Sequence, residues 1–527
     1  MIDKLLTTCD QEPIHILSRI QQSGFVFVVR YEDFSVLQVS DNCIDLIHCD
    51  PDFILNRPLQ NFFDDLFIQR IKDNVTLRFF EKRHFKAFSA VNNSKKLFCA
   101  VHCEERFIIL EISVENSALD MSTEMMFTKA VSYDNPQLPL IDLLHSIAST
   151  VQDISDFDRV LIYKFDEDNN GTVLAQVEKT FSENFLGHHF PASDIPVQAR
   201  ALYLKNRFRI IENVEESSAV LIPTINPLTN TPLDMTFCYS RSVSPIHLQY
   251  LKNMGVNSSM SISLIIQNKL WGLVVCHHPS PKKIPYGLYE SYSLLSTVFS
   301  SQIEQKEHLI RYQESSELRL KRELFLNSLG SKSDLTFASA LTEEIAVLET
   351  VLPCDIAAVY YEEDFIASNA KVPGSELFDL LRIIKNNFNG QCFQTSRLGI
   401  EFPQVAHFSI PFGGIIAIEI SNINNAYLMF IRFEQISTIE WAGEPTKQFN
   451  TEKGISVINP RASFESWKEI VTGTSLPFSS EELDSARQLS EDLYRVYNQC
   501  RVSEETRQLK ALHTQLFELI ECNPEEM

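Results

Sequence analysis

The sequence predicts an α+β protein in which small antiparallel sheets alternate with helices and long helices join the domains. At 527 residues, the chain has room for several domains of roughly 100–200 residues each. Short apolar strand patterns with helical stretches between them recur along the chain, which is typical of α+β domains. Residues 284–330 form an uninterrupted helical pattern with a charged, heptad-like centre, and they are predicted to connect two domains.

Charge and composition limit the classes of function. The chain carries 46 basic and 69 acidic side chains, a net charge of −23, which would repel phosphate backbones and anionic lipid. We therefore expect no nucleic-acid partner and no membrane partner. The sequence has no run of about 18 apolar residues and no signal-peptide core, so the expected location is cytoplasmic. Its 11 scattered cysteines are expected to be reduced thiols.

The N-terminal part divides into a leader and a strand-rich domain. Residues 1–24 carry few helix or strand signals and are predicted to be an irregular leader. Apolar and β-branched runs then favour a domain over 25–120, with helices between some of its strands. Strands are predicted at 25–30, 35–40, 75–80, 85–91, 97–103 and 107–114.

A second domain is predicted over 125–305. It begins with an apolar-periodic helix at 137–155 and contains another helix around 197–206. A segment rich in Pro, Thr and Asn, 221–235, is too long for an ordinary turn and is expected to be either a functional or a disordered loop. Strands are predicted at 159–165, 171–177, 259–267 and 270–277.

A third α+β domain is predicted over 331–500, with a long irregular excursion at about 435–475. Ser479 and Glu482 have the spacing of a capping box, which predicts a helix over 479–527. Within that helix, leucines repeat at intervals typical of a dimer seam: Leu509, Leu512, Leu516 and Leu519. A homodimer through a helical bundle is therefore expected.

Motifs of conventional catalysis are absent from the sequence. It contains no Walker loop, no dinucleotide-binding glycine turn and no nucleophile elbow. Cys99 and Cys103 would share one face of a strand and are better explained by packing than by zinc. Cys276-His277-His278 resembles a ligand set, but regular metal spacing is missing, so an organic ligand is favoured and no metal site is predicted. We expect no enzymatic activity in this chain.

Long, distinctive motifs occur at 9–15, 190–203, 244–255, 270–278 and 460–464. These motifs resemble those of the phytochromes, and of the bacteriophytochromes in particular. The resemblance covers essentially the whole chain and implies a PAS–GAF–PHY photosensory module, with the leader passing through a loop of the GAF domain. In the PHY domain, Trp441-Ala-Gly443 resembles the Trp-Gly-Gly element of the phytochrome tongue. Ala442 stands where the family has a glycine, which is expected to limit backbone torsions when the tongue refolds.

The position of a cysteine identifies the expected cofactor. Plant and cyanobacterial phytochromes carry the attachment thiol immediately before the histidine that is His247 here, but this chain has Ile246 at that position. Cys9 lies instead in the leader motif, where bacteriophytochromes bind their pigment. The resemblance therefore implies covalently attached biliverdin IXα.

The resemblance also assigns roles to pocket residues. One propionate is expected to bind Tyr203, Arg209, Arg241 and Ser244, and the other His247, Ser259 and Ser261, since guanidinium groups suit carboxylates. Asp194, followed by Ile195 and Pro196, is expected to help His247 keep the pyrrole nitrogens protonated; on local sequence alone, Asp194 would be a helix N-cap. His277 is expected to contact the outer-ring carbonyl, with Tyr163, Phe190 and Tyr250 as the aromatic wall.

Signalling is expected to run through the tongue. The resemblance implies that Arg461 pairs with Asp194 in the red-absorbing state and that Ser463 replaces it after photoconversion, when the tongue changes from strands to helix. Such a module functions as a red/far-red photoreceptor. We expect no output domain within this chain, and a downstream response regulator is the expected partner. Two alternatives are a non-photochemical GAF or PAS ligand sensor and an enzyme acting on tetrapyrroles.

Overall fold

The protein forms two compact units, 1–306 with 440–468 and 307–439 with 469–527. In this computed structural model, the described parts of the chain carry three larger sheets and one separate hairpin. The described residues are 12–76, 86–92, 95–115, 123–131, 137–332, 335–369, 371–387, 391–420, 425–445, 449–452, 455–458, 461 and 463–522.

The first sheet has the strand order β1-β11-β3-β2-β6-β5-β4, and its pairs are antiparallel. One face packs on α1 (Ile44–Ile47), α2 (Pro51–Ile54) and α3 (Asp65–Thr76) in a common apolar core. The opposite face packs on apolar residues of 219–238. The strands are β1 (Arg19–Ile20), β2 (Phe25–Arg30), β3 (Val36–Ser40), β4 (Lys86–Asn92), β5 (Lys95–Cys103), β6 (Phe107–Val114) and β11 (Ala219–Ile222).

The strand predicted at 75–80 is wrong at its start. Val75 and Thr76 end helix α3. Phe67, Ile71 and Val75 repeat at helical spacing and are buried against the first sheet, so the helix continues through residues whose β-propensity suggested a strand. Residues 77–80 lie outside the described residues.

The described part of the leader lies between the two limbs of segment 219–242. On one side, β1 pairs with β11. On the other side, the Gln21 amide donates to the Ser240 carbonyl oxygen at 2.8 Å. The prediction that the leader passes through a loop of the second domain is therefore confirmed.

The second sheet has the order β10-β12-β13-β7-β8-β9-β19-β22. Pairs from β10 to β9 are antiparallel, and β19 joins β9 in parallel through Trp441 and His189. The strands are β7 (Arg159–Phe165), β8 (Gly171–Glu178), β9 (His189–Phe190), β10 (Phe208–Ile211), β12 (Ser258–Ile266), β13 (Lys269–His278), β19 (Ser437–Ala442) and β22 (Ser466–Val471). The predicted strands of this domain thus form, with bounds shifted by a residue or two.

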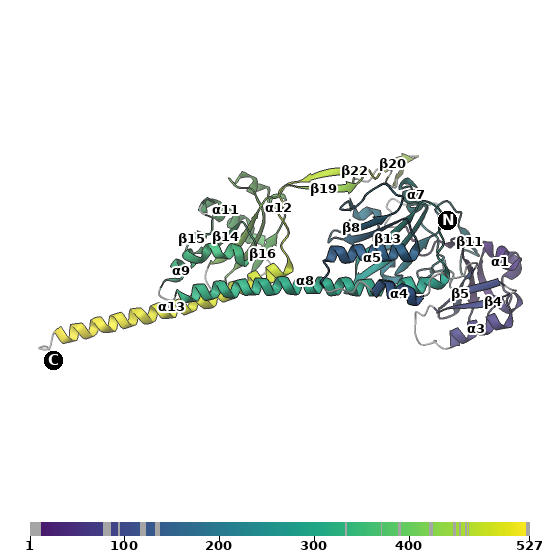
Figure 1. Cartoon of the computed structure of the whole chain (residues 1–527), viewed down its shortest axis with the longest axis horizontal. Coiled ribbons are helices and arrows are strands. Elements are labelled where there is room, and N and C mark those ends of the chain that lie inside the picture. The colour runs from purple at the N-terminus through teal and green to yellow at the C-terminus, as the bar shows by residue number, and fades with distance from the viewer. Residues whose placement is uncertain are drawn as a thin grey trace. The chain divides into compact units, whose positions relative to one another are not determined.

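Both faces of this sheet are covered by helices. The core on the first face contains apolar side chains of α4 (Thr123–Val131), α5 (Leu140–Ser155) and the N-terminal part of α8 (Tyr289–Ser331), and Figure 1 shows α5 and α8 running past β13. Over the opposite face lie α6 (Val197–Lys205) and α7 (Pro245–Asn253). These two helices enclose the candidate site.

The second unit contains an antiparallel sheet of order β15-β14-β18-β17-β16 between two helical layers. One layer includes α9 (Phe337–Glu344), α10 (Leu348–Val351), the C-terminal part of α8 and α13 (Ser480–Cys522); the other includes α11 (Gly374–Ile384) and α12 (Leu398–Glu401). The strands are β14 (Ile356–Tyr361), β15 (Asp364–Ala367), β16 (Cys392–Thr395), β17 (Phe412–Glu419) and β18 (Tyr427–Phe433). A separate hairpin pairs β20 (Phe449–Glu452) with β21 (Ile455–Ile458).

The capping box predicted for the last helix is present. The Glu482 amide donates to Ser479 Oγ at 3.0 Å, and the Ser479 amide donates to Glu482 Oε2 at 2.9 Å. Of the predicted seam, Leu509, Leu512 and Leu516 are exposed, while the side chain of Leu519 lies outside the described residues. None of the helices in the described ranges is long and apolar enough to cross a bilayer.

Candidate functional site

A cavity of about 530 Å³ lies between the second sheet and helices α6 and α7. Its volume is within the range of sites that bury an organic ligand. It is lined by the sequence-predicted residues Tyr163, Phe190, Asp194, Ile195, Pro196, Tyr203, Arg209, Arg241, Ser244, His247, Tyr250, Ser259, Ser261, His277, Arg461 and Ser463. Segments far apart in the sequence therefore meet at one site.

Strand alternation decides which side chains face this cavity. On β7, Leu161 and Tyr163 line the cavity, whereas Val160 and Ile162 belong to the helix-covered core. On β13, Val275 and His277 line it, and the cysteine between them is core. Because successive side chains of a strand point to opposite faces, Cys276 cannot join His277 as a ligand.

Short polar contacts support the sheet side of the cavity. Ser261 Oγ lies 3.5 Å from the hydroxyl of Tyr203 on α6, and the Ser263 hydroxyl donates to the Tyr203 carbonyl oxygen at 2.8 Å. Helix α6 is thereby fixed to β12. Ser259 lies on the same strand at the next inward-facing position.

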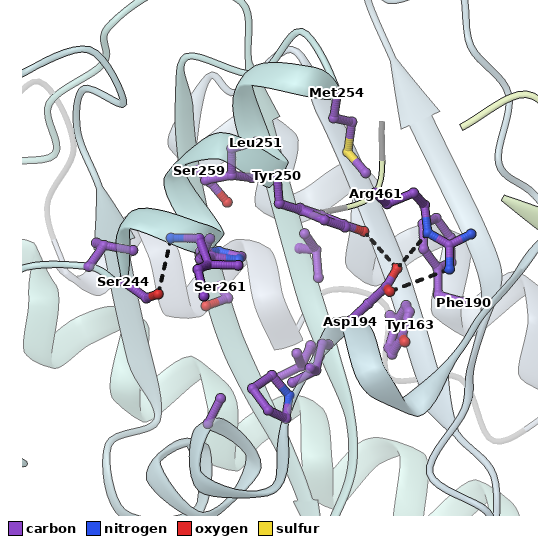
Figure 2. A pocket seen from close by; sticks show the side chains of 18 of the residues that line it. Tyr163, Phe190, Asp194, Ser244, Tyr250, Leu251, Met254, Ser259, Ser261 and Arg461 are labelled. Atoms are coloured by element: carbon purple, nitrogen blue, oxygen red, sulfur yellow. Dashed lines mark hydrogen bonds and ion pairs between the residues drawn. The ribbon is translucent and has the colours of Figure 1, made fainter. Parts of the chain in front are cut away.

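Asp194 receives hydrogen bonds from two directions. It ends a 3-10 turn (Ala192–Asp194) before Pro196, which precedes α6. Tyr250 Oη donates to its Oδ2 at 3.2 Å, and Arg461 Nη2 donates to its Oδ1 at 3.4 Å. Arg461 Nε also lies 3.3 Å from Oδ2, as part of an ion pair. Figure 2 shows the three side chains converging beside Phe190. Pro196, two positions after Asp194, occupies the N-cap position of α6.

Arg461 is fixed by hydrogen bonds as well as by its ion pair with Asp194. Its Nη1 donates to the Ala442 carbonyl oxygen at 2.6 Å, and Asn253 Nδ2 donates to the Arg461 carbonyl oxygen at 2.8 Å. The Arg461 and Asp194 side chains are only 9% and 10% exposed. A nearly dry ion pair of this kind depends strongly on both partners being present.

Two arginines give the cavity a positive end. Arg209 donates to the carbonyl oxygens of Tyr239, at 3.1 Å, and of Ser242, at 3.0 Å. Arg241 donates to the Ile14 carbonyl oxygen of the leader at 3.1 Å. Burial lowers the pKa of Arg209 to about 9 and also lowers the pKa of Arg241. An anion placed here would offset the cost of burying two cations.

Glu111 of the first sheet positions the segment that carries Arg241. It accepts hydrogen bonds from the Ser240 amide at 2.7 Å and from His102 Nε2 at 2.7 Å. Burial alone would raise the pKa of Glu111, but the hydrogen bonds from His102 and Ser240 hold it below its ordinary value. Within the described ranges, the one group of side chains near enough to share a metal ion is His102, Glu111 and Cys238. The hydrogen bond from His102 to Glu111 accounts for the proximity of two of them.

Both cavity histidines are held neutral. Burial, followed by the charge of Arg209, lowers the pKa of His247 to about 4. The His247 ring stacks on Tyr250, with centroids 5.9 Å apart. Burial, followed by Arg159 and His247, holds the pKa of His277 well below its usual value. Neutral imidazoles can each donate one hydrogen bond and accept another.

The remaining predicted residues lie beside the cavity or beyond the described chain. Trp441 does not line it but packs on His189, with ring centroids 5.7 Å apart. Ser463 Oγ accepts from the Glu465 amide at 3.3 Å. Cys9 lies outside the described residues, although Glu12, three positions later, contributes to the lining and accepts from Ser244 Oγ at 2.6 Å.

Sequence reasoning missed several residues of the site. Leu202, Ser242 and Met254 also line the cavity. Met254 lies within the motif 244–255 used for the resemblance, so its proximity was available from that match. Arg159 was missed because nothing in the sequence states that it lies directly opposite His277 on the neighbouring strand.

Family models match the chain in three consecutive regions: a PAS fold over 9–115, a GAF domain over 139–306 and the phytochrome region over 321–501. Two solved structures are similar over nearly their whole length. The bacteriophytochrome RpBphP3 of R. palustris has a TM-score of 0.83 at 28% identity, covering 93% of this chain and 99% of that one. The photosensory core module of the Stigmatella aurantiaca phytochrome has a TM-score of 0.78 at 29% identity, with coverages of 94% and 99%.

Curated relatives agree with this architecture. Phytochrome-like protein Cph1 of Synechocystis is 31% identical over 525 residues, covering 96% of this chain and 68% of the relative. Cyanobacterial phytochrome B of Nostoc is 31% identical over 503 residues, covering 92% and 65%. A bacteriophytochrome of Pseudomonas aeruginosa is 30% identical over 498 residues, covering 93% and 66%. The chain thus spans about two thirds of the length of these relatives.

The fold and the site together define a photosensory core of the PAS–GAF–PHY class. The chain belongs to the phytochrome family. The family and the fold class inferred from the sequence motifs are therefore confirmed.

Proposed function

We propose that this protein is a red/far-red photoreceptor that binds biliverdin IXα, attached covalently through Cys9. The observation that carries the proposal is a single cavity with two buried arginines, two neutral histidines and an aspartate paired to the tongue. The role is sensory rather than enzymatic. When bound, the pigment would supply the absorption of red light and an isomerisation at its D ring.

The residues present fit a tetrapyrrole with two carboxylates. Arg241 Nε is buried and has no hydrogen-bond partner among the described residues, which suits a propionate oxygen. Arg209 reinforces the positive potential at this end of the cavity, and Tyr203 and Ser244 offer hydroxyls to the same group. The second propionate would meet Ser259, Ser261 and His247.

The centre of the cavity suits a protonated set of pyrrole nitrogens. A buried cation needs acceptors. The main-chain carbonyl of Asp194 and the neutral His247 would supply them, the histidine through a water. The Asp194 carboxylate is engaged by Tyr250 and Arg461, so the proposed contact to the pigment is assigned to its main-chain carbonyl.

The far end of the cavity suits an apolar ring that carries a carbonyl group. His277 would donate a hydrogen bond to that carbonyl. Tyr163, Phe190 and Tyr250 would form the wall of the ring, and the Tyr163 and Phe190 ring centroids lie 5.9 Å apart. Burial raises the pKa of Tyr250 well above its usual value, so its phenol stays protonated and keeps donating to Asp194.

We infer that the signal leaves through the tongue. Loss of the Arg461–Asp194 pair, with Ser463 taking the place of Arg461, would favour a change of the tongue from strands to helix. Trp441 would take part through its contact with His189. The third domain, proposed over 331–500, would pass the change to the helix over 479–527, and its exposed leucines would form a parallel homodimer.

The proposed module has a leader over 1–24, a PAS domain over 25–120, a GAF domain over 125–305 and a connecting helix over 284–330. The tongue would occupy about 435–475. A response regulator of a two-component system is the proposed downstream partner, and the proposed location is cytoplasmic.

An absorbance spectrum of the purified chain mixed with biliverdin tests the function. We expect a red-absorbing adduct that converts under red light and reverts under far-red light. Binding without any light-induced change would contradict the photoreceptor and favour a non-photochemical ligand sensor. A pigment consumed to a new product would favour an enzyme acting on tetrapyrroles.

A further inference from the structure

Arg159 and His277 are direct cross-strand neighbours on the cavity side of the second sheet. Arg159 opens β7 and His277 lies near the end of β13, in antiparallel register. Arg159 Nη2 lies 3.0 Å from His277 Nδ1. Arg159 is fully buried and His277 is 4% exposed, so bulk water does not compete for this contact.

The chemistry of the two groups fixes the direction of the hydrogen bond. A guanidinium group has only donors, so His277 Nδ1 must be the acceptor. An imidazole that accepts at Nδ1 and remains neutral carries its proton on Nε2. A protonated ring would instead turn an N–H toward the guanidinium, placing two cations in contact.

The surroundings of Arg159 orient it toward His277. Its guanidinium carbon lies 4.2 Å from the Phe181 ring centroid and 4.7 Å from that of Phe185. Among the described residues, its Nε and Nη1 make no hydrogen bond. Nη1 has only a distant ion pair of 3.6 Å with Glu183, whose side chain is 57% exposed. The hydrogen bond to His277 is thus the principal polar contact of a buried cation.

We propose that Arg159 is a positioning residue that fixes His277 as a neutral imidazole with its proton on Nε2. The ring then presents a permanent hydrogen-bond donor at this end of the cavity. That end would accept a ligand group with an exposed oxygen acceptor, such as a lactam carbonyl, and would discriminate against one that presents an N–H. Only the identity of this ligand rests on the proposed function; the state of the imidazole does not.

The charged and titratable groups around the pair support a neutral ring. His247, on α7, is the other titratable group acting on His277, and it is itself held neutral. The carboxylates that act on Arg159 are Glu183, Asp158 and Glu178, and the phenol of Tyr250 acts on it as well. These acids favour the charged form of Arg159.

Nitrogen NMR of the full chain, labelled with ¹⁵N-histidine and measured without pigment, tests the proposal. The His277→Gln variant identifies the two ring signals of His277 among the 13 histidines. In the wild type we expect the Nε2–H tautomer and no titration between about pH 5.5 and 8.5, since a free histidine would titrate near 6.5.

Two substitutions separate the hydrogen bond from simple space filling. Arg159→Met keeps the apolar length but removes the donor, and because His277 is neutral the change leaves no unpaired charge on that residue. We expect a mixture of tautomers and an upward shift of the His277 pKa by at least about one unit. Arg159→Lys restores a cationic donor and should return the Nε2–H tautomer. If the methionine variant does not fold, an Nδ1–H tautomer of His277 in the wild type would itself overturn the inference. Glu183→Gln is the matched control and should leave the tautomer unchanged.

The outcome is independent of whether the pigment binds. The same tautomer and the same lack of titration in wild type and Arg159→Met would overturn the inference, even if biliverdin binds and photoconverts. Conversely, a chain that shows the expected tautomer change but does not bind biliverdin would contradict the proposed function and leave the role of Arg159 supported.

Discussion

Removing the Arg461 side chain is expected to loosen the tongue from the cavity. Arg461 Nε lies 3.3 Å from Asp194 Oδ2, and at an effective dielectric constant of about 20 two unit charges at that separation attract by about 5 kcal/mol. Desolvation of both groups offsets much of this attraction. Tyr250 still donates to Asp194 after the substitution. We therefore expect a coupling energy of about 1–3 kcal/mol between Arg461 and Asp194.

Hydrogen exchange followed by mass spectrometry measures this coupling where it acts. The Gly443 amide donates to the Glu465 carbonyl oxygen at 2.9 Å and reports on the docked tongue. In Arg461→Ala its exchange should accelerate by about 10- to 100-fold, because about 1.4 kcal/mol corresponds to a factor of ten. Asp194→Asn and the double variant complete the cycle.

A neighbouring ion pair provides the control. Lys468 Nζ lies 2.9 Å from Glu440 Oε1 in the same part of the tongue, but both side chains are exposed to solvent. Lys468→Ala should change the exchange of Gly443 by less than about threefold. If the effects of Arg461→Ala and Asp194→Asn simply add in the double variant, the buried pair does not hold the tongue, and the reasoning is refuted.

Three further outcomes test other parts of the structure. Cys9→Ser should leave biliverdin bound but not covalent, so a zinc-fluorescent band on a denaturing gel would contradict the attachment site. The pKa of His247 falls from 6.5 to about 4 on folding, so the unfolded chain takes up more protons between those pH values and the folded state loses stability as the pH is lowered. When the free energy of unfolding is measured in urea at pH 7 and at pH 4.5, His247→Gln should therefore lose less stability than the wild type, by on the order of 2 kcal/mol. Gly443 has φ +82°, and a Cβ there would lie 2.2 Å from the Ser463 carbonyl oxygen. Gly443→Ala should therefore accelerate hydrogen exchange in the tongue as strongly as Arg461→Ala. Equal exchange rates in Gly443→Ala and the wild type would show that the tongue backbone adapts.

The structure shows how the tongue accommodates Ala442, which stands where the family has a glycine and is expected to limit backbone torsions when the tongue refolds. In the structure Ala442 ends strand β19 and is fully buried, and its carbonyl oxygen accepts from Arg461. The left-handed conformation falls on the next residue, Gly443. A side chain at 442 is therefore compatible with the docked tongue.

The motifs that resemble those of the phytochromes predicted the cavity residues, and strand alternation explains which side chains of each strand face the cavity. Alternation along β7 and β13 separates Tyr163 and His277, which face the cavity, from Cys276, which faces the core. Long motifs then identified the helices that close the other side. These signals are local, because each depends on residues within one element.

Contacts between elements could not be predicted in the same way. The pairing of β11 with β1 and β3 inserts a strand of the second domain into the first sheet, and a single sequence carries no signal for such long-range register. The contact between Arg159 and His277 depends on register as well. The hydrogen bond from the Ser240 amide to Glu111 joins residues 129 positions apart. Apolar periodicity thus predicts the faces of elements, whereas polar contacts across elements require the tertiary fold.

The contacts around α7 explain why a change inside the cavity can reach the tongue. Tyr250 lines the cavity and donates to Asp194, while Asn253, one turn later on the same helix, donates to the Arg461 carbonyl oxygen. Arg461 in turn contacts both Asp194 and the Ala442 carbonyl oxygen at the end of β19. A displacement of α7 therefore alters two links to the tongue together. Since a bistable segment responds to small differences in contact energy, the tongue would need no direct contact with the ring that we propose to isomerise.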